Sequence, residues 1–236
     1  MKIIRKVNIN KDYYSGYSLS NFFAIKMLKN QITKDTLDVD LLNSAIFYCT
    51  NQERIRFNIS ACEFHPVLRD SSIIHSAQMK MHDFFNHENH FNPQYKTLRD
   101  RVNSIMTEKN SGFSCIGENI SDYPILKTEG NKFVVKSLFN NQRYYSIDGL
   151  REIHPFTYEE LAREVVNGWM NSQGHRQNIL NPQFKFLGCG AVMYEKKNNS
   201  VSVSMIYFKI TQNFGGNLMQ GFRSKETDKK IRIIKK

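Results

Sequence analysis

Two histidines, one glutamate and one serine are the side chains of this sequence best suited to chemistry at a site. His87 lies in the run Phe-Phe-Asn-His-Glu-Asn-His over residues 84–90, and Glu118 is the one carboxylate in the apolar run over residues 112–120. An acid in such a run is either exposed at an edge or paired inside the protein. Ser172 and His175 lie three residues apart, where a helix is predicted to end.

A serine beside a histidine, as at Ser172 and His175, is the combination of residue types found in a nucleophile and its general base. Both lie close to one helix end, however, and no acid is placed in sequence to complete a triad. A serine at such a position more commonly hydrogen-bonds locally, and a single histidine there more commonly satisfies a neighbouring carbonyl. The sequence also has no His-Glu-x-x-His motif and no Gly-x-Ser-x-Gly motif. These residues alone therefore do not predict an enzyme.

A helix from about residue 157 to residue 172 must position Ser172 and His175. Thr157 is its predicted N-cap, and Glu160 three residues later completes a capping box. One apolar face recurs at helical spacing through Leu161, Val165, Val166 and Trp169. Gly174 is expected to end the helix in the left-handed conformation and to place His175 on the turn that follows.

Three earlier helices and several strands complete the expected framework. The apolar spacing predicts helices over residues 38–57 and 68–85, and a third of three turns from Tyr95 to Ile105. Two strands, over residues 186–194 and 201–212, are joined by the loop 196–199, and a further hairpin is expected within residues 121–156 around Asn140 and Asn141. Helices mixed with antiparallel strands in this order predict an α+β sandwich.

Composition and charge limit the class of protein. The 236 residues are 40% hydrophobic, which indicates a globular protein, and the formal net charge is +11. Lysine is abundant throughout the chain, alongside many Asn and Ile residues, which indicates a background bias in composition and not a nucleic-acid-binding surface. The basic tail over residues 221–236 is predicted to be solvated. No stretch is long and apolar enough to span a membrane. No apolar run follows the basic N-terminus, so the protein is cytoplasmic unless a leader was removed, in which case it is extracellular or in the cell envelope.

The four cysteines do not form a recognisable framework. Cys49, Cys62, Cys115 and Cys189 include no Cys-x-x-Cys pair, so a zinc ribbon is not expected. Four thiols in a chain of this length also do not make a disulfide scaffold. Cys49 and Cys189 lie in apolar surroundings and are predicted to be small buried hydrophobes.

Six motifs taken together resemble the CAP superfamily of cysteine-rich secretory proteins, venom allergens and plant pathogenesis-related proteins, and most closely its bacterial branch, with an SCP-like domain. In chain order they are Asn51-x-x-Arg54, Phe84-Phe85-x-His87, Gly117-Glu118-Asn119-Ile120, Trp169-x-x-Ser172-x-Gly174-His175-Arg176-x-Asn178, Phe184-x-x-Leu187-Gly188-x-Gly190 and Thr211-Gln212-x-Phe214-Gly215. The resemblance covers residues 38–217. It leaves residues 1–37 as an N-terminal extension, 121–156 as an insertion and 218–236 as a basic tail.

The resemblance implies a three-layer α-β-α sandwich with a central antiparallel sheet. It also implies a ligand cleft lined by His87, Glu118, Ser172 and His175. By motif position His87 and His175 match the two family histidines and Glu118 the first glutamate. Ser172 stands where many eukaryotic members have a second glutamate, so the cleft has one negative charge fewer.

These residue types suit a metal ion. Two imidazoles and a carboxylate are ordinary ligands of Zn²⁺, and the set His87, Glu118 and His175 would leave a fourth position open for water. Structural pairing of Glu118, or its use in orienting a histidine, is the other interpretation. His90 lies three residues after His87. We interpret it mainly as a surface residue, and a role as a substitute metal ligand is the second interpretation.

Two functional hypotheses follow. The first is a non-catalytic binding module whose cleft, with or without metal, takes a lipid, a peptide or a protein partner. The second is a metal-dependent hydrolase that uses His87, Glu118 and His175 with a bound water. The family has no shared reaction, and a fold does not fix a function.

Overall fold

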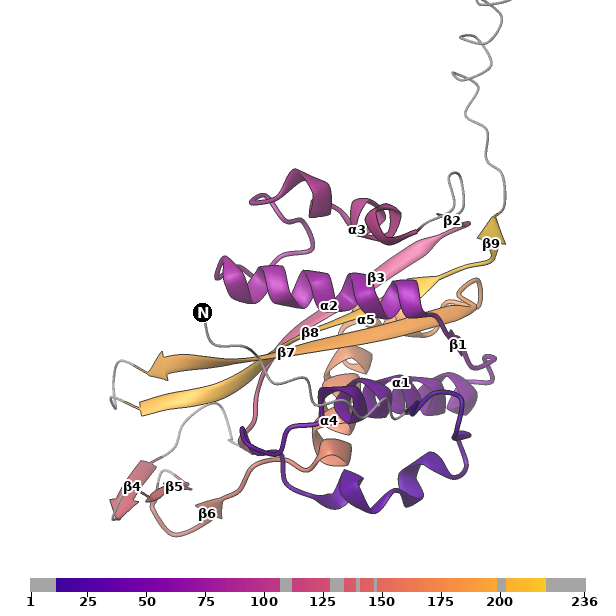
Figure 1. Ribbon diagram of the computed structural model, residues 1–236. Coiled ribbons are helices and arrows are strands. Elements are labelled where there is room, and N and C mark those ends of the chain that lie inside the picture. The colour runs from indigo at the N-terminus through magenta and orange to yellow at the C-terminus, as the bar shows by residue number, and fades with distance from the viewer. Residues whose placement is uncertain are drawn as a thin grey trace, which may run out of the picture.

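The computed structural model describes residues 12–106, 112–127, 134–138, 141–146, 148–198 and 203–219. Its centre is a four-stranded sheet in the order β1-β7-β8-β3 (Figure 1). The strands are β1 Glu63–Phe64, β3 Ile116–Pro124, β7 Phe186–Asn198 and β8 Val203–Gly215. β7, β8 and β3 pair antiparallel, whereas the short β1 pairs parallel with β7. The predicted α+β class is confirmed, with a mixed sheet where a purely antiparallel one was expected.

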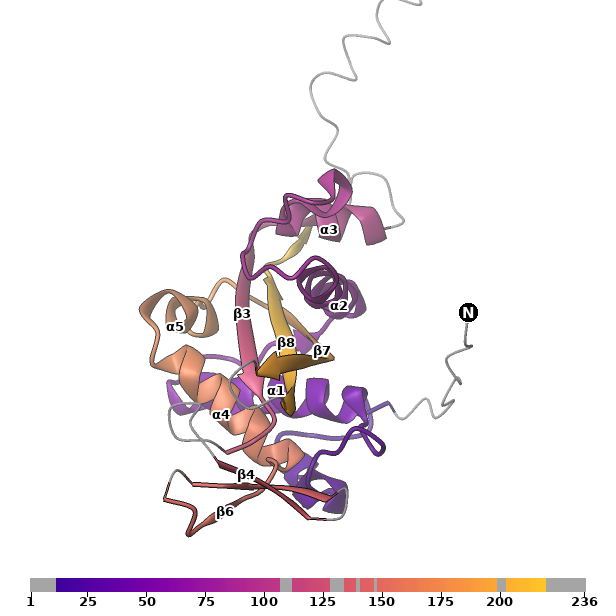
Figure 2. The same ribbon diagram turned by 90° about the vertical axis from the view of Figure 1, so that its left-hand side faces the viewer.

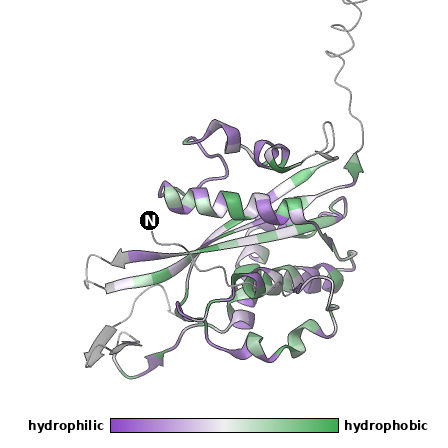
Figure 3. Cartoon of the chain, in the orientation of Figure 1, coloured by the Kyte–Doolittle hydropathy of each residue, from purple (hydrophilic) through white to green (hydrophobic). Residues whose placement is uncertain are grey.

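Helices cover both faces of the sheet and give it three layers (Figure 1). Helices α2 Pro66–Met81 and α3 Leu98–Ile105 lie on one side, and α1 Val39–Arg56 and α4 Tyr158–Met170 lie on the other. Figure 2 shows β3 between α2 and the short helix α5 Gln173–Ile179. Hydrophobic and hydrophilic residues alternate along α2 (Figure 3), as expected for a helix with one face on a sheet.

Two glycines let α2 lie directly on β7. A Cβ atom at Gly188 would stand 2.1 Å from the backbone nitrogen of Arg69, and one at Gly190 would stand 2.3 Å from that of Ile73. Ser72 and Ser76 of α2 then donate to the carbonyls of Gly188 and Gly190 at 3.1 and 2.9 Å. The Gly-x-Gly motif is therefore a requirement of backbone packing.

The helix that precedes His175 ends earlier than predicted. The Thr157–Glu160 capping box of α4 is present as expected. α4 ends at Met170, however, and after a break at Asn171 and Ser172 the chain forms the second helix α5. Gly174 lies inside α5 and does not end a helix in the left-handed conformation, and His175 is helical. The prediction of a glycine stop was wrong because the break falls three residues earlier.

Two other boundaries also differ from the predictions. α2 ends at Met81, and Asp83 adopts a left-handed conformation with φ of 48°. Residues 82–92 therefore form a loop, and His87 lies on this loop and not at a helix end. The third predicted helix is divided into the 3-10 turn η3 Pro93–Tyr95 and α3, which begins with its own Thr97–Asp100 capping box.

The N-terminal segment is part of the main core. Phe22, Leu28 and Ile32 are completely buried in it, and Phe22 and Leu28 belong to the 3-10 turns η1 Phe22–Ala24 and η2 Lys26–Lys29. The predicted burial of Cys49 and Cys189 is confirmed, and all four cysteines are free.

Two smaller sheets lie outside the central one. β4 Val134–Leu138 and β5 Asn141–Tyr145 pair antiparallel, which confirms the predicted hairpin, and β6 Glu152–Ile153 adds a third strand. β2 Gly112–Phe113 pairs with β9 Leu218–Met219. The basic tail over residues 221–236 lies outside the described residues. Within the described part of the chain, no helix is both long and apolar enough to cross a membrane.

Candidate functional site

Glu118 is the centre of the site. It lies on β3 opposite Asn213 of β8, and only 6% of its side chain is exposed. Its Oε1 atom accepts from Nδ1 of His87 at 3.0 Å, and its Oε2 atom forms an ion pair with the Arg101 guanidinium. With its amide turned to satisfy both ends, Asn213 also donates to Oε2 at 3.0 Å. The predicted alternative of an acid paired inside the protein is the one observed.

Arg101, which sequence reasoning missed, supplies the positive charge. It lies on α3, its side chain has no exposure, and it also donates to the carbonyls of His87, Tyr95 and Lys96 at 3.2–3.4 Å. The same guanidinium therefore ties the His87 loop, α3 and β3 together. An arginine on a short amphipathic helix is normally exposed, so sequence spacing gave little signal of this burial.

His75 is a second residue that sequence reasoning missed. It is completely buried on α2, with Nε2 2.9 Å from the carbonyl of Asn86 and 3.7 Å from Oε1 of Glu118. Burial lowers the pKa of His75 to about 4, against the attraction of Glu118, so the ring is neutral near pH 7. Its place one turn before the buried Met79 is a signal that could have identified it.

The Glu118 carboxyl stays ionised. Burial raises its pKa, but the His87 hydrogen bond and the positive charge of Arg101 outweigh burial, and the pKa is lowered overall. The carboxylate in turn fixes the ring of His87, whose side chain is 53% exposed. This is the relationship by which a buried carboxylate orients an accessible histidine.

Helix α5 brings His175 to the same end of β3. Asn178 donates to the backbone carbonyl of Glu118 at 3.0 Å and to Oδ1 of Asn119 at 2.9 Å, and Asn119 donates to the carbonyl of His175 at 3.2 Å. Burial lowers the pKa of His175, and the nearby His87 lowers it further. The two predicted histidines are therefore close enough to repel one another when charged.

Ser172 has a structural position at the start of α5. It is the N-cap residue of the helix, although its hydroxyl makes no capping hydrogen bond. Within the described residues, the side chains of Ser172 and His175 form no hydrogen bond with Glu118. Of the four predicted cleft residues, the structure thus joins His87 and Glu118 directly and places His175 beside them.

The remaining motif residues hold α5 in place. Arg54, which is 1% exposed, donates to the carbonyls of Ile179, Asn181 and Phe184 at 2.7–3.0 Å, and so satisfies the end of α5 and the loop after it. Trp169 donates to the carbonyl of Ile120 at 3.0 Å. Together with Asn178, it occupies carbonyls on the free edge of β3, and this protects the edge from pairing with another chain.

A shallow groove of about 450 Å³ lies beside His87. It runs between the His87 loop, the start of α3 and the first residues of β3. Its lining is mixed: His87, Glu88, Thr97, Leu98, Arg99, Ile116, Gly117 and Glu118. The groove therefore offers hydrogen-bonding groups and apolar side chains in alternation.

The expected zinc site does not fit Glu118 as a ligand in this arrangement. Both of its oxygens are engaged, and the Arg101 guanidinium already neutralises the charge that a metal would need. Among the described residues, no group of three or more His, Cys, Asp or Glu side chains is arranged to hold a metal ion. His87 and His175 keep the ligand types for Zn²⁺, so metal binding by the predicted set stays a prediction.

The fold is a three-layer α+β sandwich with a histidine–glutamate pair at the edge of its sheet. The chain belongs to the CAP family, the cysteine-rich secretory protein family, which matches residues 47–214. The resemblance stated from the motifs is thereby confirmed.

Three bacterial proteins are among those that the chain resembles. The uncharacterized protein YkwD of Bacillus subtilis (strain 168) is 26% identical over 163 residues, which are 69% of this chain and 47% of YkwD. The uncharacterized membrane protein YlbC of the same organism is 26% identical over 165 residues, 70% of this chain and 33% of YlbC. An extracellular protein containing an SCP domain from Bacillus anthracis str. Ames aligns with 26% identity and a TM-score of 0.47 over 80% of this chain and 45% of that one. The chain thus spans less than half the length of these relatives.

Proposed function

We propose that this domain is a non-catalytic binding module whose ligand lies in the groove beside His87. The observation that carries the proposal is the closed network around Glu118. Because Arg101 and His87 occupy its oxygens, the carboxylate acts as a positioning group and not as a reactive one. His87 is then held with Nδ1 on Glu118, and its Nε2 atom has no partner among the described residues.

A peptide segment of a partner protein suits the groove best. In the neutral tautomer that donates from Nδ1, Nε2 of His87 is an acceptor for a peptide N–H group. Arg99 adds further hydrogen-bond donors, and Leu98 and Ile116 offer apolar contact. A site for a lipid chain would be lined mainly by apolar side chains, which this groove is not.

A metal-dependent hydrolase is the alternative. It would need Glu118 to exchange its contact with Arg101 for a metal ion, which would leave a buried guanidinium without its anion. If Glu118 instead keeps its contact with Arg101, two histidines alone would supply the metal ligands from the protein. The positioning role of Glu118 therefore supports binding over hydrolysis.

Selection from a displayed library of random peptides would test the proposal. We expect peptides that bind the wild-type domain to lose at least about ten-fold in affinity for His87→Ala, which removes one charge-assisted or neutral hydrogen bond at a partly buried site. Leu98→Ala is expected to weaken binding through the apolar part of the groove. His90→Ala is the matched control, because His90 is on the same loop, is exposed and does not line the groove.

Three outcomes would overturn the proposal. Selected peptides that bind His87→Ala as tightly as wild type would place their site elsewhere. A fluorescent fatty acid that binds in a His87-dependent way, where peptides do not, would replace the peptide by a lipid. Cleavage of bound peptides, detected by mass spectrometry and lost in His87→Ala, would establish the hydrolase.

An extracellular or cell-envelope location is part of the proposal. It is supported by the description of the matching family as cysteine-rich secretory proteins. Fractionation of cells that express the complete gene, with immunodetection of the domain, would test it. Recovery in the cytoplasmic fraction alone would contradict this location.

A further inference from the structure

A second cavity, remote from His87, is built from aromatic rings and carboxylates. It has a volume of about 470 Å³ and lies between α1, β1 and the N-terminal segment. Five rings line it, from Tyr14, Tyr17, Phe47, Tyr48 and Phe64, and two acids, Asp12 and Glu63, stand at its exposed rim. Within the described part of the chain its lining contains no Lys, Arg or His.

This lining contrasts with the rest of the protein. The chain carries a net charge of +11, so a cavity whose charged groups are both anionic departs from the overall balance. Aromatic faces and carboxylates together attract cations, because ring quadrupoles and negative charges act in the same direction. An anion or a purely apolar ligand would gain nothing from the two acids.

The rings form one connected cluster. Phe64 stacks on Tyr14 with centroids 3.7 Å apart, and Tyr14 meets Phe47 edge-to-face at 5.4 Å. Arg69 already lies over the Phe64 ring at 5.7 Å while it pairs with Asp70. The aromatic cluster thus already contacts one cation of the protein, the Arg69 guanidinium. We infer the same contact between a cation and a ring for the open side of the cluster.

The segment that closes the cavity is preorganised. The hydroxyl of Tyr48 donates to the carbonyl of Tyr17 at 2.8 Å, and the carbonyl of Tyr13 lies 3.1 Å from the same oxygen. Asp12 accepts from the backbone nitrogens of Tyr14 and Ser15 at 3.0 and 3.1 Å. A ligand would therefore not have to order this segment, and preorganisation of this kind favours binding.

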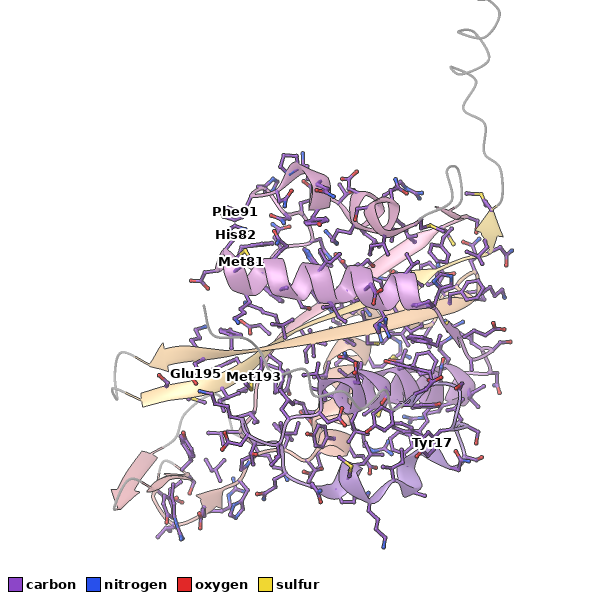
Figure 4. All side chains as sticks on the ribbon, viewed as in Figure 1. Tyr17, Met81, His82, Phe91, Met193 and Glu195 are labelled. Atoms are coloured by element: carbon purple, nitrogen blue, oxygen red, sulfur yellow. The ribbon has the colours of Figure 1, made fainter. Side chains whose placement is uncertain are left out.

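Tyr17 is the ring most accessible to a ligand. It is 39% exposed and lies beside α1, on the side of the N-terminal segment (Figure 4). Phe47 and Tyr48, by contrast, are almost completely buried and form the floor.

We propose that this cavity binds an organic cation with a methylated ammonium group, held by the exposed ring of Tyr17 and by the charges of Asp12 and Glu63. Such a group could be a free solute or the headgroup of a lipid. The proposal is independent of the groove beside His87.

Titration with choline, followed by NMR of the backbone amides, tests the proposal. We expect saturable shifts centred on residues 12–19 and 61–64, and an affinity that falls as salt is raised. The neutral analogue 3,3-dimethylbutan-1-ol, in which carbon replaces the charged nitrogen, should bind at least about five-fold more weakly. Equal affinity for the two compounds, or no saturation with choline, would overturn the proposal.

Matched variants locate the site. Tyr17→Leu and Glu63→Gln should each weaken choline binding by about three-fold or more, whereas Tyr17→Phe keeps the ring and should bind like wild type. Both positions are exposed, so the variants are expected to fold, and their urea midpoints would confirm it. His87→Ala should leave choline binding unchanged, and loss of binding in that variant would contradict a separate site.

A second arm distinguishes the source of the cation. Co-sedimentation with phosphatidylcholine vesicles, lost in Tyr17→Leu, would identify a lipid headgroup. Choline binding without co-sedimentation would identify a soluble cation. Co-sedimentation that persists in both Tyr17→Leu and Glu63→Gln would place membrane contact elsewhere and overturn the lipid source.

Discussion

Arg101 of α3 and Glu118 of β3 form an ion pair in which neither side chain is more than 6% exposed. The pair joins a helix of one layer to the edge strand of the sheet. It also determines what the site can do, because a carboxylate already neutralised by a guanidinium is poorly suited to hold a metal ion and well suited to hold a histidine.

Removing the arginine should be costly. In Arg101→Met the Glu118 carboxylate stays buried without its main partner, and we expect a loss of about 3–5 kcal/mol in the free energy of unfolding. Urea denaturation at pH 7 would measure it. Arg99→Met, at an exposed position two residues earlier, is the control and should change stability by less than about 0.5 kcal/mol. A loss below about 1 kcal/mol for Arg101→Met would show that the pair is not a structural element.

Acid should destabilise the domain through His75. Its pKa is about 4 in the folded protein and 6.5 as an ordinary value, so the unfolded chain binds a proton first as the pH falls. Stability should therefore decrease between pH 6.5 and about 4, by up to about 3 kcal/mol from this group. The pKa of Glu118 is lowered in the folded protein, so this carboxylate adds a further loss of stability as the pH falls below its ordinary pKa of 4.5.

A variant separates the contribution of His75 from the rest. His75→Gln keeps a donor for the carbonyl of Asn86 but does not titrate, so the slope of stability against pH between 6.5 and 4 should flatten. His90→Gln, at an exposed position, should leave the slope as in wild type. An unchanged slope in His75→Gln would mean that another group accounts for the acid sensitivity.

Two glycine substitutions should have opposite signs. Gly190→Ala places a Cβ 2.3 Å from a backbone nitrogen of α2 and should cost at least about 3 kcal/mol or prevent folding. Gly168→Ala, within α4, meets nothing within 4 Å and should stabilise the protein by about 0.5–1 kcal/mol. Thermal unfolding of both variants measures the difference. Similar melting temperatures for the two would refute the close approach of α2 to β7.

Arg54 should be sensitive to a conservative change. Its guanidinium donates to several carbonyls at once, which a lysine ammonium cannot reproduce. We expect Arg54→Lys to lose about 2–3 kcal/mol in urea denaturation, from buried carbonyls left without donors. Arg56→Lys, whose side chain is 74% exposed, should be close to neutral. If the two variants lose the same stability, Arg54 does not hold the end of α5.

Local sequence patterns were enough to predict the main helices and the class of fold. Capping residues and apolar spacing located α1 and α4 within two residues, because caps and burial periodicity are local properties of the chain. The motifs also named His87, Glu118 and His175, which the fold brings to one end of β3; their role as a ligand or metal site stays a prediction.

The partners of these residues, by contrast, depend on the tertiary structure. His75 and Arg101 are distant from Glu118 along the chain and lie in helices whose sequence gives no sign of a shared carboxylate. Their burial depends on how α2 and α3 pack on the sheet. The C-terminal end of α5 likewise depends on Arg54 of α1, which donates to the carbonyl of Ile179. Burial and long-range hydrogen bonds are properties of packed layers, so local sequence patterns could not supply them.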